Sequence, residues 1–293
     1  MAAIKSIHLE VLAVSTGIAL GVAYFLLKFA GINGGLALFG SASLLAFVVL
    51  APYGRAKIFM HVFRMPLIWR GIIFSATQIL ICESIRTGSA TSALSASVLG
   101  SVTGVACGRI ILKEAIHGKS ALGLLVAVMG ALLCLNSVPT SIFAVVAGLL
   151  VGLNSTLTRS LLKSANFELL PVIAIPLLYA GLIMTGFEVL RFGSSGIEAL
   201  SMRSLVSFVV CLLFAQIMTC LVLKQMDSQK VAGYTLTRLP TAATLEALSF
   251  GKMLPLIEIG GMILIAAGAG WLFYNETRKI PCALAKITHV DHS

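Results

Sequence analysis

Apolar runs of about 20 residues recur along the whole chain, and no other feature limits its possible folds so strongly. Short polar breaks separate the runs. Continuous apolar runs of this length are not soluble strands, and helices satisfy their own backbone hydrogen bonds in lipid. The sequence therefore predicts an all-α integral membrane protein.

The composition agrees with this fold class. The chain has 293 residues, of which 58% are hydrophobic and 11% charged, and its mean hydropathy is +1.02. These values lie far outside the balance of soluble domains. Little sequence remains outside the apolar runs, so no sizeable soluble domain is expected.

The apolar runs divide the chain into ten expected transmembrane helices, whose ends are approximate. A short cytoplasmic N-terminal tail (1–8) precedes a first five-helix repeat (9–137). A second five-helix repeat (138–275) and a cytoplasmic C-terminal tail (276–293) follow. The expected helices are 9–28, 34–51, 66–85, 89–111, 119–136, 141–162, 170–190, 204–223, 229–251 and 256–274.

Lys and Arg gather at the ends of the apolar runs and set the expected orientation. The formal net charge is +10, but no basic tract typical of nucleic-acid binding occurs. With the N-terminus inside, most basic residues, Arg70 among them, fall on the cytoplasmic side, which puts both termini in the cytoplasm. The basic residues left on the outer side are Lys28, Arg86, Arg191, Arg203 and Lys252.

The two halves of the chain resemble each other. A shift of 138 residues lays SALGLLVAVMGALLCL (120–135) on EIGGMILIAAGAGWLF (258–273), so that Gly123 meets Gly261 and Gly130 meets Gly268. Because each half holds an odd number of helices, the halves must enter the membrane in opposite senses. Inverted repeats of this kind are typical of transporters. The glycines also fit close helix packing, which we take as their role.

Residues 84–135, SIRTGSATSALSASVLGSVTGVACGRIILKEAIHGKSALGLLVAVMGALLCL, resemble the end of the first half of an EamA-like member of the drug/metabolite transporter superfamily. RLPTAATLEALSFGKMLPLIEIGG (238–261) resembles the Pro-bearing ninth helix of that family. The chain departs from the family pattern in two places. Gly100 to Thr103 replace the proline common in the fourth helix, and Lys252 replaces an acidic residue that Glu114 keeps in the first half.

This resemblance implies a secondary carrier of the inner membrane that exports small metabolites, often amino acids or their toxic analogues. It also implies a central cavity lined mainly by the first, third, fourth, sixth, eighth and ninth helices.

Arg238 is the most unusual residue within an apolar run. It lies nine to ten residues into the ninth expected helix, near the middle of the bilayer, where a charge is costly and marks a functional site by default. Pro240 leaves the carbonyl of Leu236 without its helical donor, which predicts a helix break. We expect Arg238 to bind a substrate carboxylate. Pairing with a buried carboxylate, or a break at Leu239 that lets Arg238 reach the cytoplasmic face, remains an alternative.

Glu246 is an acid well inside the same run, which suits a proton-coupling site because apolar surroundings favour a neutral carboxyl. A salt bridge near the outer interface is the alternative. Glu83 and Arg86, three residues apart, predict an ion pair at the outer mouth. The other residues expected to bind substrate are polar or aromatic: Gln78, Tyr24, Ser95, Asn154, Thr158, Gln216 and Tyr234.

The sequence gives no support to an enzyme. HGKS (117–120) resembles the end of a phosphate loop, but the glycine that the motif requires is Lys113. HExxH, GxSxG and Cys/His clusters are absent, and the six cysteines are scattered. No metal and no cofactor are expected.

The sequence thus predicts a transporter that exports an amino acid or amino-acid-like metabolite by alternating access. Its expected partners are this substrate and the lipid bilayer, with proton coupling and a homodimer left open and nucleic acid excluded. Uptake or exchange of another metabolite is one alternative. A non-transporting membrane subunit or flippase accessory is another.

Overall fold

The structure is a computed structural model that describes residues 2–29, 35–87, 97–115, 118–135, 142–164, 166–193, 200–251 and 255–277. These residues form helices and no strand, which confirms the all-α class. In chain order the helices are α1 (Ala2–Phe29), α2 (Gly35–Leu50), η1 (Ala51–Gly54), α3 (Arg55–His61), α4 (Met65–Thr87), α6 (Ser97–Ile111), α7 (Gly118–Leu135), α8 (Ile142–Lys163), α9 (Leu169–Phe192), α11 (Met202–Gln225), α12 (Ser228–Thr235), α13 (Arg238–Phe250) and α14 (Leu256–Thr277).

Each of the ten expected ranges contains helix, with three differences. Helix α1 begins at Ala2, so the expected tail 1–8 is helical from its second residue. The described part of the fourth range begins at Ser97. The ninth range, 229–251, is two helices, α12 and α13, rather than one.

Six helical segments are long and apolar enough to cross a membrane. Three shorter apolar helices, Leu99–Ile111, Gly118–Cys134 and Leu256–Leu272, accompany them. Large apolar side chains also point outward, such as Leu190 at 89% and Leu248 at 78% exposure. Exposed apolar surface of this kind suits lipid contact, so the fold is compatible with a multi-pass membrane protein.

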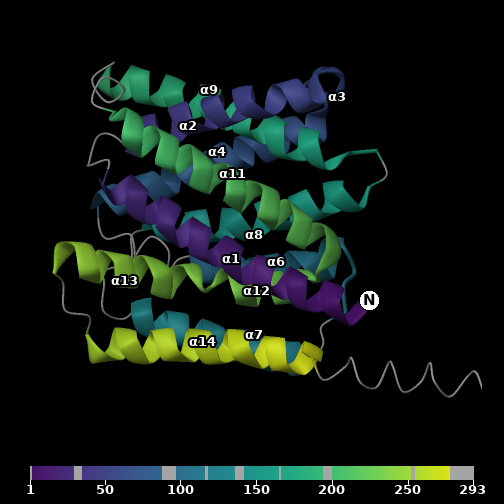
Figure 1. Ribbon diagram of the computed structural model, residues 1–293, viewed down its shortest axis with the longest axis vertical. Helices are drawn as coiled ribbons and strands as arrows, with labels where there is room; N and C mark the ends of the chain where they lie inside the picture. The colour runs from purple at the N-terminus through teal and green to yellow at the C-terminus, as the bar shows by residue number, and fades with distance from the viewer. Residues whose placement is uncertain are drawn as a thin grey trace, which may run out of the picture.

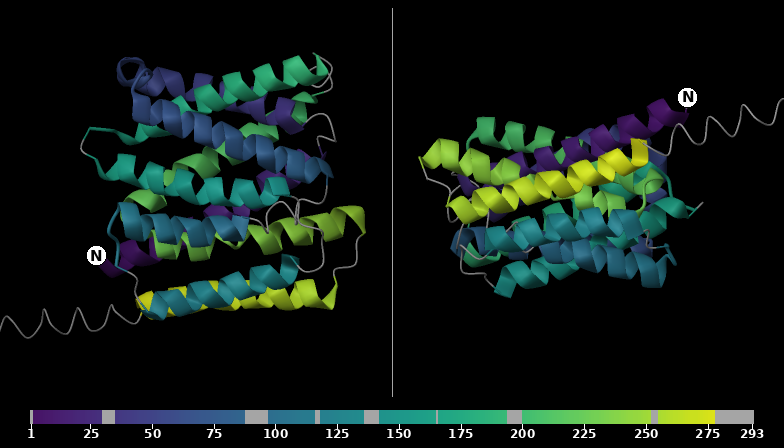
Figure 2. Two further views of the ribbon diagram at one scale, coloured as in Figure 1. Left: turned by 180° about the vertical axis from the view of Figure 1, so that it is seen from behind. Right: turned by 90° about the horizontal axis from the view of Figure 1, so that it is seen from below.

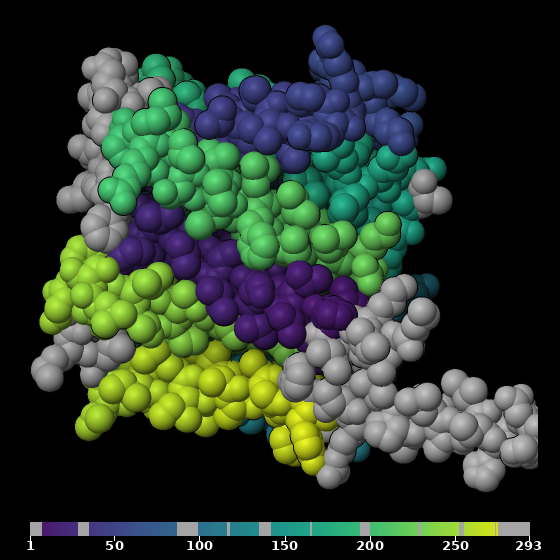
Figure 3. Space-filling model, in the orientation of Figure 1, coloured from purple at the N-terminus to yellow at the C-terminus, as the bar shows by residue number. Residues whose placement is uncertain are grey.

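The long helices lie side by side in one slab, with their axes running in roughly the same direction (Figure 1). Helices α7 and α14 form one edge of the slab, and α2 and α9 form the opposite edge, as the view from behind also shows (Figure 2). Helices α1 and α11 cover the middle of one face (Figure 3). The broken pair α12 and α13 lies between α1 and the α7–α14 edge.

The packing contacts come in matched sets. Helix α8 packs on α4 and α6, while α1 packs on α11 and on the α12–α13 pair. Likewise α9 packs on α4, and α2 packs on α11. Helices α2 and α9 also pack on each other, as do α7 and α14. These main contacts therefore correspond in pairs when each helix is exchanged for its counterpart in the other half of the chain.

Glycines bring α7 and α14 into close contact. A methyl group on Gly268 would lie 2.5 Å from the carbonyl oxygen of Gly123, and one on Gly130 would lie 2.5 Å from that of Gly261. The two helices therefore run antiparallel, and each contributes the same pair of glycines spaced seven apart. The packing role predicted for these glycines is confirmed.

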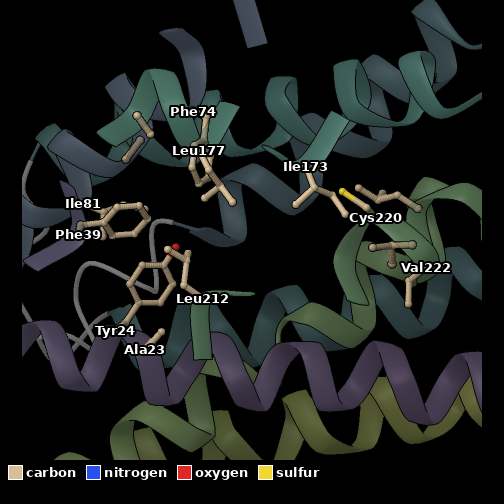
Figure 4. Close-up of a cluster of buried hydrophobic side chains, with 14 of the residues drawn as sticks. Ala23, Tyr24, Phe39, Phe74, Ile81, Ile173, Leu177, Leu212, Cys220 and Val222 are labelled. Atoms are coloured by element: carbon tan, nitrogen blue, oxygen red, sulfur yellow. The ribbon is translucent and has the colours of Figure 1, made fainter. Parts of the chain in front are cut away.

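Aromatic and aliphatic side chains fill the middle of the slab (Figure 4). The ring of Phe39 on α2 packs edge-on against Phe74 of α4 and Phe208 of α11, with centroids 6.0 and 5.4 Å apart. Tyr24 points from α1 toward Leu212 at the edge of this cluster. The cluster joins α1, α2, α4 and α11 into one core.

We expect Gly268→Ala to destabilise the protein, because the new methyl group would force the α7–α14 backbones apart at a cost of about 2 kcal/mol. Gly270→Ala is the matched control, since nothing lies within 4 Å of the added methyl group there and alanine favours the helix. Thermal unfolding of both purified variants in detergent measures the difference. Equal unfolding temperatures would contradict the close contact.

Candidate functional site

The site is built around the break between α12 and α13. Helix α12 ends at Thr235 and α13 begins at Arg238. Pro240 has no N–H for the carbonyl of Leu236, and that carbonyl accepts from the Leu239 N–H instead, at 3.0 Å. The N–H of Leu236 donates to Gly233 at 3.3 Å. The chain thus tightens into i to i+3 bonds before the proline, and the helix is interrupted there.

Helix α1 holds this break in place through two glycines. A methyl group on Gly21 would lie 2.8 Å from the carbonyl oxygen of Arg238, and one on Gly17 would lie 3.1 Å from that of Tyr234. The Thr237 hydroxyl donates to Tyr234 at 2.7 Å and lies 3.4 Å from the carbonyl of Val14 on α1. The interrupted backbone therefore has partners in its own chain and in α1.

Arg238 leaves the break into a polar cavity. Its side chain is buried, with 5% exposure, and the cavity has an empty volume of about 850 Å³ counting the part open at its mouth. The Tyr24 hydroxyl lies against the Gln78 amide and near the Arg238 guanidinium. The polar residues around the cavity are Tyr24, Arg70, Thr77, Gln78, Ser101, Asn154, Ser155, Thr158, Gln216, Thr219, Thr235 and Arg238.

Arg70 is a second guanidinium at this cavity. It is 2% exposed, and its Nε donates to the Thr158 hydroxyl at 2.6 Å. Its Nη1 donates to the carbonyl of Val172. Pro176 lies four residues later within α9 and cannot supply the N–H that this carbonyl would normally accept. Arg70 therefore satisfies a carbonyl that a proline leaves without its helical donor.

The charge of the cavity is one-sided. Among its described lining residues, two are arginines and none is a carboxylate. Amide and hydroxyl groups supply the remaining polarity. The cavity lining can donate hydrogen bonds to a ligand and accept them from it. Among the described lining residues, the charged groups are both cations.

The structure brings together six of the residues expected to bind substrate: Tyr24, Gln78, Asn154, Thr158, Gln216 and Arg238. Tyr234 is fully buried at the helix break, outside the cavity lining. Ser95 lies outside the described residues. These positions describe where the side chains lie, and their roles in binding stay predictions.

The structure differs from what was expected of the ninth helix in where the helix breaks and in where Arg238 and Glu246 lie. The break lies at Leu236 and Thr237, before Pro240 itself and before Leu239. Arg238 does not reach the surface. Glu246 is buried on α13 at 7% exposure and is absent from the lining of the Arg238 cavity.

Arg70 was predicted to lie among the cytoplasmic charges, and the structure places it at the cavity instead. A basic residue five residues after the start of an apolar helix such as α4 is also typical of a residue that sets membrane topology. The proline within the seventh expected helix, Pro176, was the available clue, because it predicts a carbonyl in need of a donor.

Another buried arginine, Arg159, forms ion pairs with carboxylates. It is 3% exposed and pairs with Glu114 and with Asp227, the latter at 3.2 Å. Lys163 also reaches Glu114, at 3.1 Å. This cluster, which we call the Glu114 network, joins the segment after α6 to α8 and to the α11–α12 junction.

Glu83, near the C-terminal end of α4, forms one ion pair within its own helix and one with α9. Glu83 pairs with Arg86 at 2.8 Å, which confirms the expected ion pair, and with Arg191 of α9. A second cavity, lined by Glu83, Arg86, Lys28 and Glu188 among others, lies beside them. Among the described residues, no cluster of His, Cys, Asp and Glu could hold a metal ion.

Comparison with known proteins supports the fold alone. No family model matches the chain, and no curated protein matches it. A solved structure described only as "Crystal structure of protein" is similar over 88% of this chain and 94% of that one, with a TM-score of 0.68 and 14% sequence identity. At this identity the similarity carries no information about activity.

We expect Thr158→Val to destabilise the protein more than Thr156→Val. The first change leaves the charged Nε of Arg70 without its acceptor, at a cost of about 2 kcal/mol. Thr156 bonds only to the backbone carbonyls of Gly152 and Gly104, so its loss should cost about 0.6 kcal/mol. Unfolding of the two purified variants in detergent gives the comparison, and a larger loss for Thr156→Val would refute it.

Proposed function

We propose that this protein is a secondary active transporter that exports a small metabolite by alternating access. The observation that supports this function is the polar cavity at the interrupted helix α12–α13, enclosed within an apolar helical slab. Broken helices lining a cavity between two halves are how many carriers build substrate sites.

The two halves of the proposed carrier are inverted repeats of five membrane helices, residues 9–137 and 138–275. The matched packing contacts support this division, since the main contacts that a helix of one half makes are also made by its counterpart in the other half. The antiparallel glycine contacts of α7 and α14 support opposite insertion of the halves. The helices around the Arg238 cavity come from both halves, as alternating access requires.

The proposed location is the inner membrane, with both termini in the cytoplasm. The distribution of Lys and Arg supports this orientation. The Glu114 network and the Lys57–Glu168 pair then lie at the cytoplasmic end, and the Glu83 ion pairs lie at the outer end.

The substrate that we propose carries a carboxylate, and amino acids or similar compounds are the first class to test. The buried guanidinium of Arg238 in the cavity supports this choice, because arginine binds carboxylates in a two-pronged geometry. The resemblance to EamA-like carriers supports the same class.

We expect cells that overproduce the protein to release a compound that cells with Arg238→Ala do not. Loss of the guanidinium should reduce export by at least tenfold, since removing one member of a buried charge pair costs about 2 kcal/mol or more. Arg203→Ala, at an exposed arginine, is the matched control and should export normally. Comparison of extracellular metabolites makes the measurement. Unchanged export by both Arg238→Ala and Arg238→Lys would remove Arg238 from the site.

Proton coupling at Glu246 is a separate proposal. Glu246→Gln should lose transport driven by a pH gradient and keep exchange of labelled substrate across proteoliposomes, because the amide cannot release a proton. Its buried place on α13, the helix that Arg238 begins, supports a link to the cavity. Accumulation that still follows the pH gradient in Glu246→Gln would rule this residue out as the coupling site.

A further inference from the structure

The connection between α2 and α4 exposes many large apolar side chains. It consists of η1, α3 and the start of α4 (residues 51–69), and we call it the basic–aromatic segment. The segment lies at the end of the slab where the N-terminus lies (Figure 1) and projects from the edge that α2 and α9 form (Figure 3). Its large apolar side chains, each between 59% and 84% exposed, are Tyr53, Phe59, Met60, Phe63, Met65 and Trp69. Exposed apolar surface on this scale marks an interaction site.

One side of this segment is fixed to α9. Helix α3 packs on α9, and Ile58 is buried, with 2% exposure. The Tyr179 hydroxyl of α9 donates to the carbonyl of Val62 at 3.0 Å. Lys57 pairs with Glu168, which directly precedes α9, at 2.6 Å. The segment is therefore held against the protein by one side and presents its other side outward.

The charges of the segment are all basic. Arg55, Lys57 and Arg64 are exposed, and residues 51–69 include no Asp or Glu. Among the residues that the structure describes, no carboxylate forms an ion pair with Arg55 or Arg64. The Arg64 guanidinium instead lies over the Phe167 ring, 5.6 Å from its centroid. Basic and aromatic side chains on one surface are typical of elements that lie in a membrane interface.

Two kinds of partner could cover this surface: lipid and a second copy of the chain. A twofold contact between copies would bring the same cations of both copies together, which electrostatics disfavours. Val48 and Val49, which directly precede the segment, are 60% and 45% exposed and belong to a helical stretch long and apolar enough to cross a membrane. Lipid that surrounds α2 therefore reaches the segment as well, so lipid is the partner that the surface fits.

We infer that the basic–aromatic segment binds anionic phospholipid, with its aromatic side chains at the level of the acyl chains and Arg55 and Arg64 against the headgroups. Phosphatidylcholine carries a cation of its own, so a cationic surface should prefer a lipid with net negative charge, such as phosphatidylglycerol. This inference goes beyond the proposed transport function and rests only on the proposed place of the protein in a membrane.

The fluorescence of Trp69 reports which lipid lies beside the segment. The chain has two tryptophans, so Trp271→Phe leaves Trp69 as the only one. The purified full-length variant is placed in bilayers of phosphatidylcholine and phosphatidylglycerol, in which the acyl chains of one lipid or the other carry bromine, a quencher. We expect the phosphatidylglycerol to be favoured beside Trp69 by about fivefold or more. Equal quenching by the two lipids at equal mole fraction, or no quenching by either, as contact with a second copy would produce, overturns the inference.

Exchange of the two arginines shows whether they cause this preference. In the Trp271→Phe background, Arg55→Gln combined with Arg64→Gln should reduce the preference to less than about twofold, because glutamine carries no charge. Both positions are exposed, so the variant should elute as the wild type in gel filtration. Arg203→Gln, at an exposed arginine outside the segment, is the matched control and should keep the full preference. A preference that survives the double exchange, or that Arg203→Gln removes equally, contradicts the inference.

The lipid measurement needs no transport, which keeps this inference distinct from the proposed function. A preference for anionic lipid beside Trp69 in a protein that moves no metabolite would support the lipid site and contradict the carrier. Metabolite export together with equal quenching by the two lipids would support the carrier and contradict the lipid site.

Discussion

Backbone carbonyls buried among apolar side chains need a hydrogen-bond donor from the protein, because apolar surroundings supply none. Two prolines, Pro176 and Pro240, each remove one helical donor. The Leu236 carbonyl accepts a hydrogen bond from the Leu239 N–H, which tightens the backbone and interrupts the helix. The Val172 carbonyl accepts one from the guanidinium of Arg70 on α4. Both solutions place an arginine at the same cavity. The polar cavity is thus found where two helices satisfy carbonyls that a proline leaves without a helical donor.

The cavity also depends on helices whose backbones approach each other closely. Gly17 and Gly21 let α1 lie against the interrupted chain, and the glycines of α7 and α14 let those helices cross without side chains between them. Without water, helices gain little from burying apolar side chains against each other, so close packing carries more of the association energy. The glycine contacts at α1 therefore position Arg238, and those of α7 and α14 join the two ends of the proposed repeats.

The sequence predicted the helices, the packing glycines of α7 and α14, and six polar residues of the cavity. Apolar length, small-residue spacing and a charge beside a proline each have a direct physical meaning. The sequence misplaced Arg70, since a basic residue near a helix end has the same appearance whether it marks topology or lines a cavity. Tyr234 was also expected at the cavity, but which face of a helix meets the cavity is not readable from residue type alone. Tyr234 lies fully buried in α12, outside the cavity lining.

The most direct test of alternating access around this cavity is thiol labelling of Ser155→Cys in a protein whose six native cysteines are replaced by alanine. Ser155 lines the cavity, so a carrier that opens to each side in turn should be labelled by a membrane-impermeant reagent in both right-side-out and inverted vesicles. Ala174→Cys, at a fully buried position outside the lining, should be labelled in neither. Labelling of Ser155→Cys from one side alone, or from neither, would contradict the account.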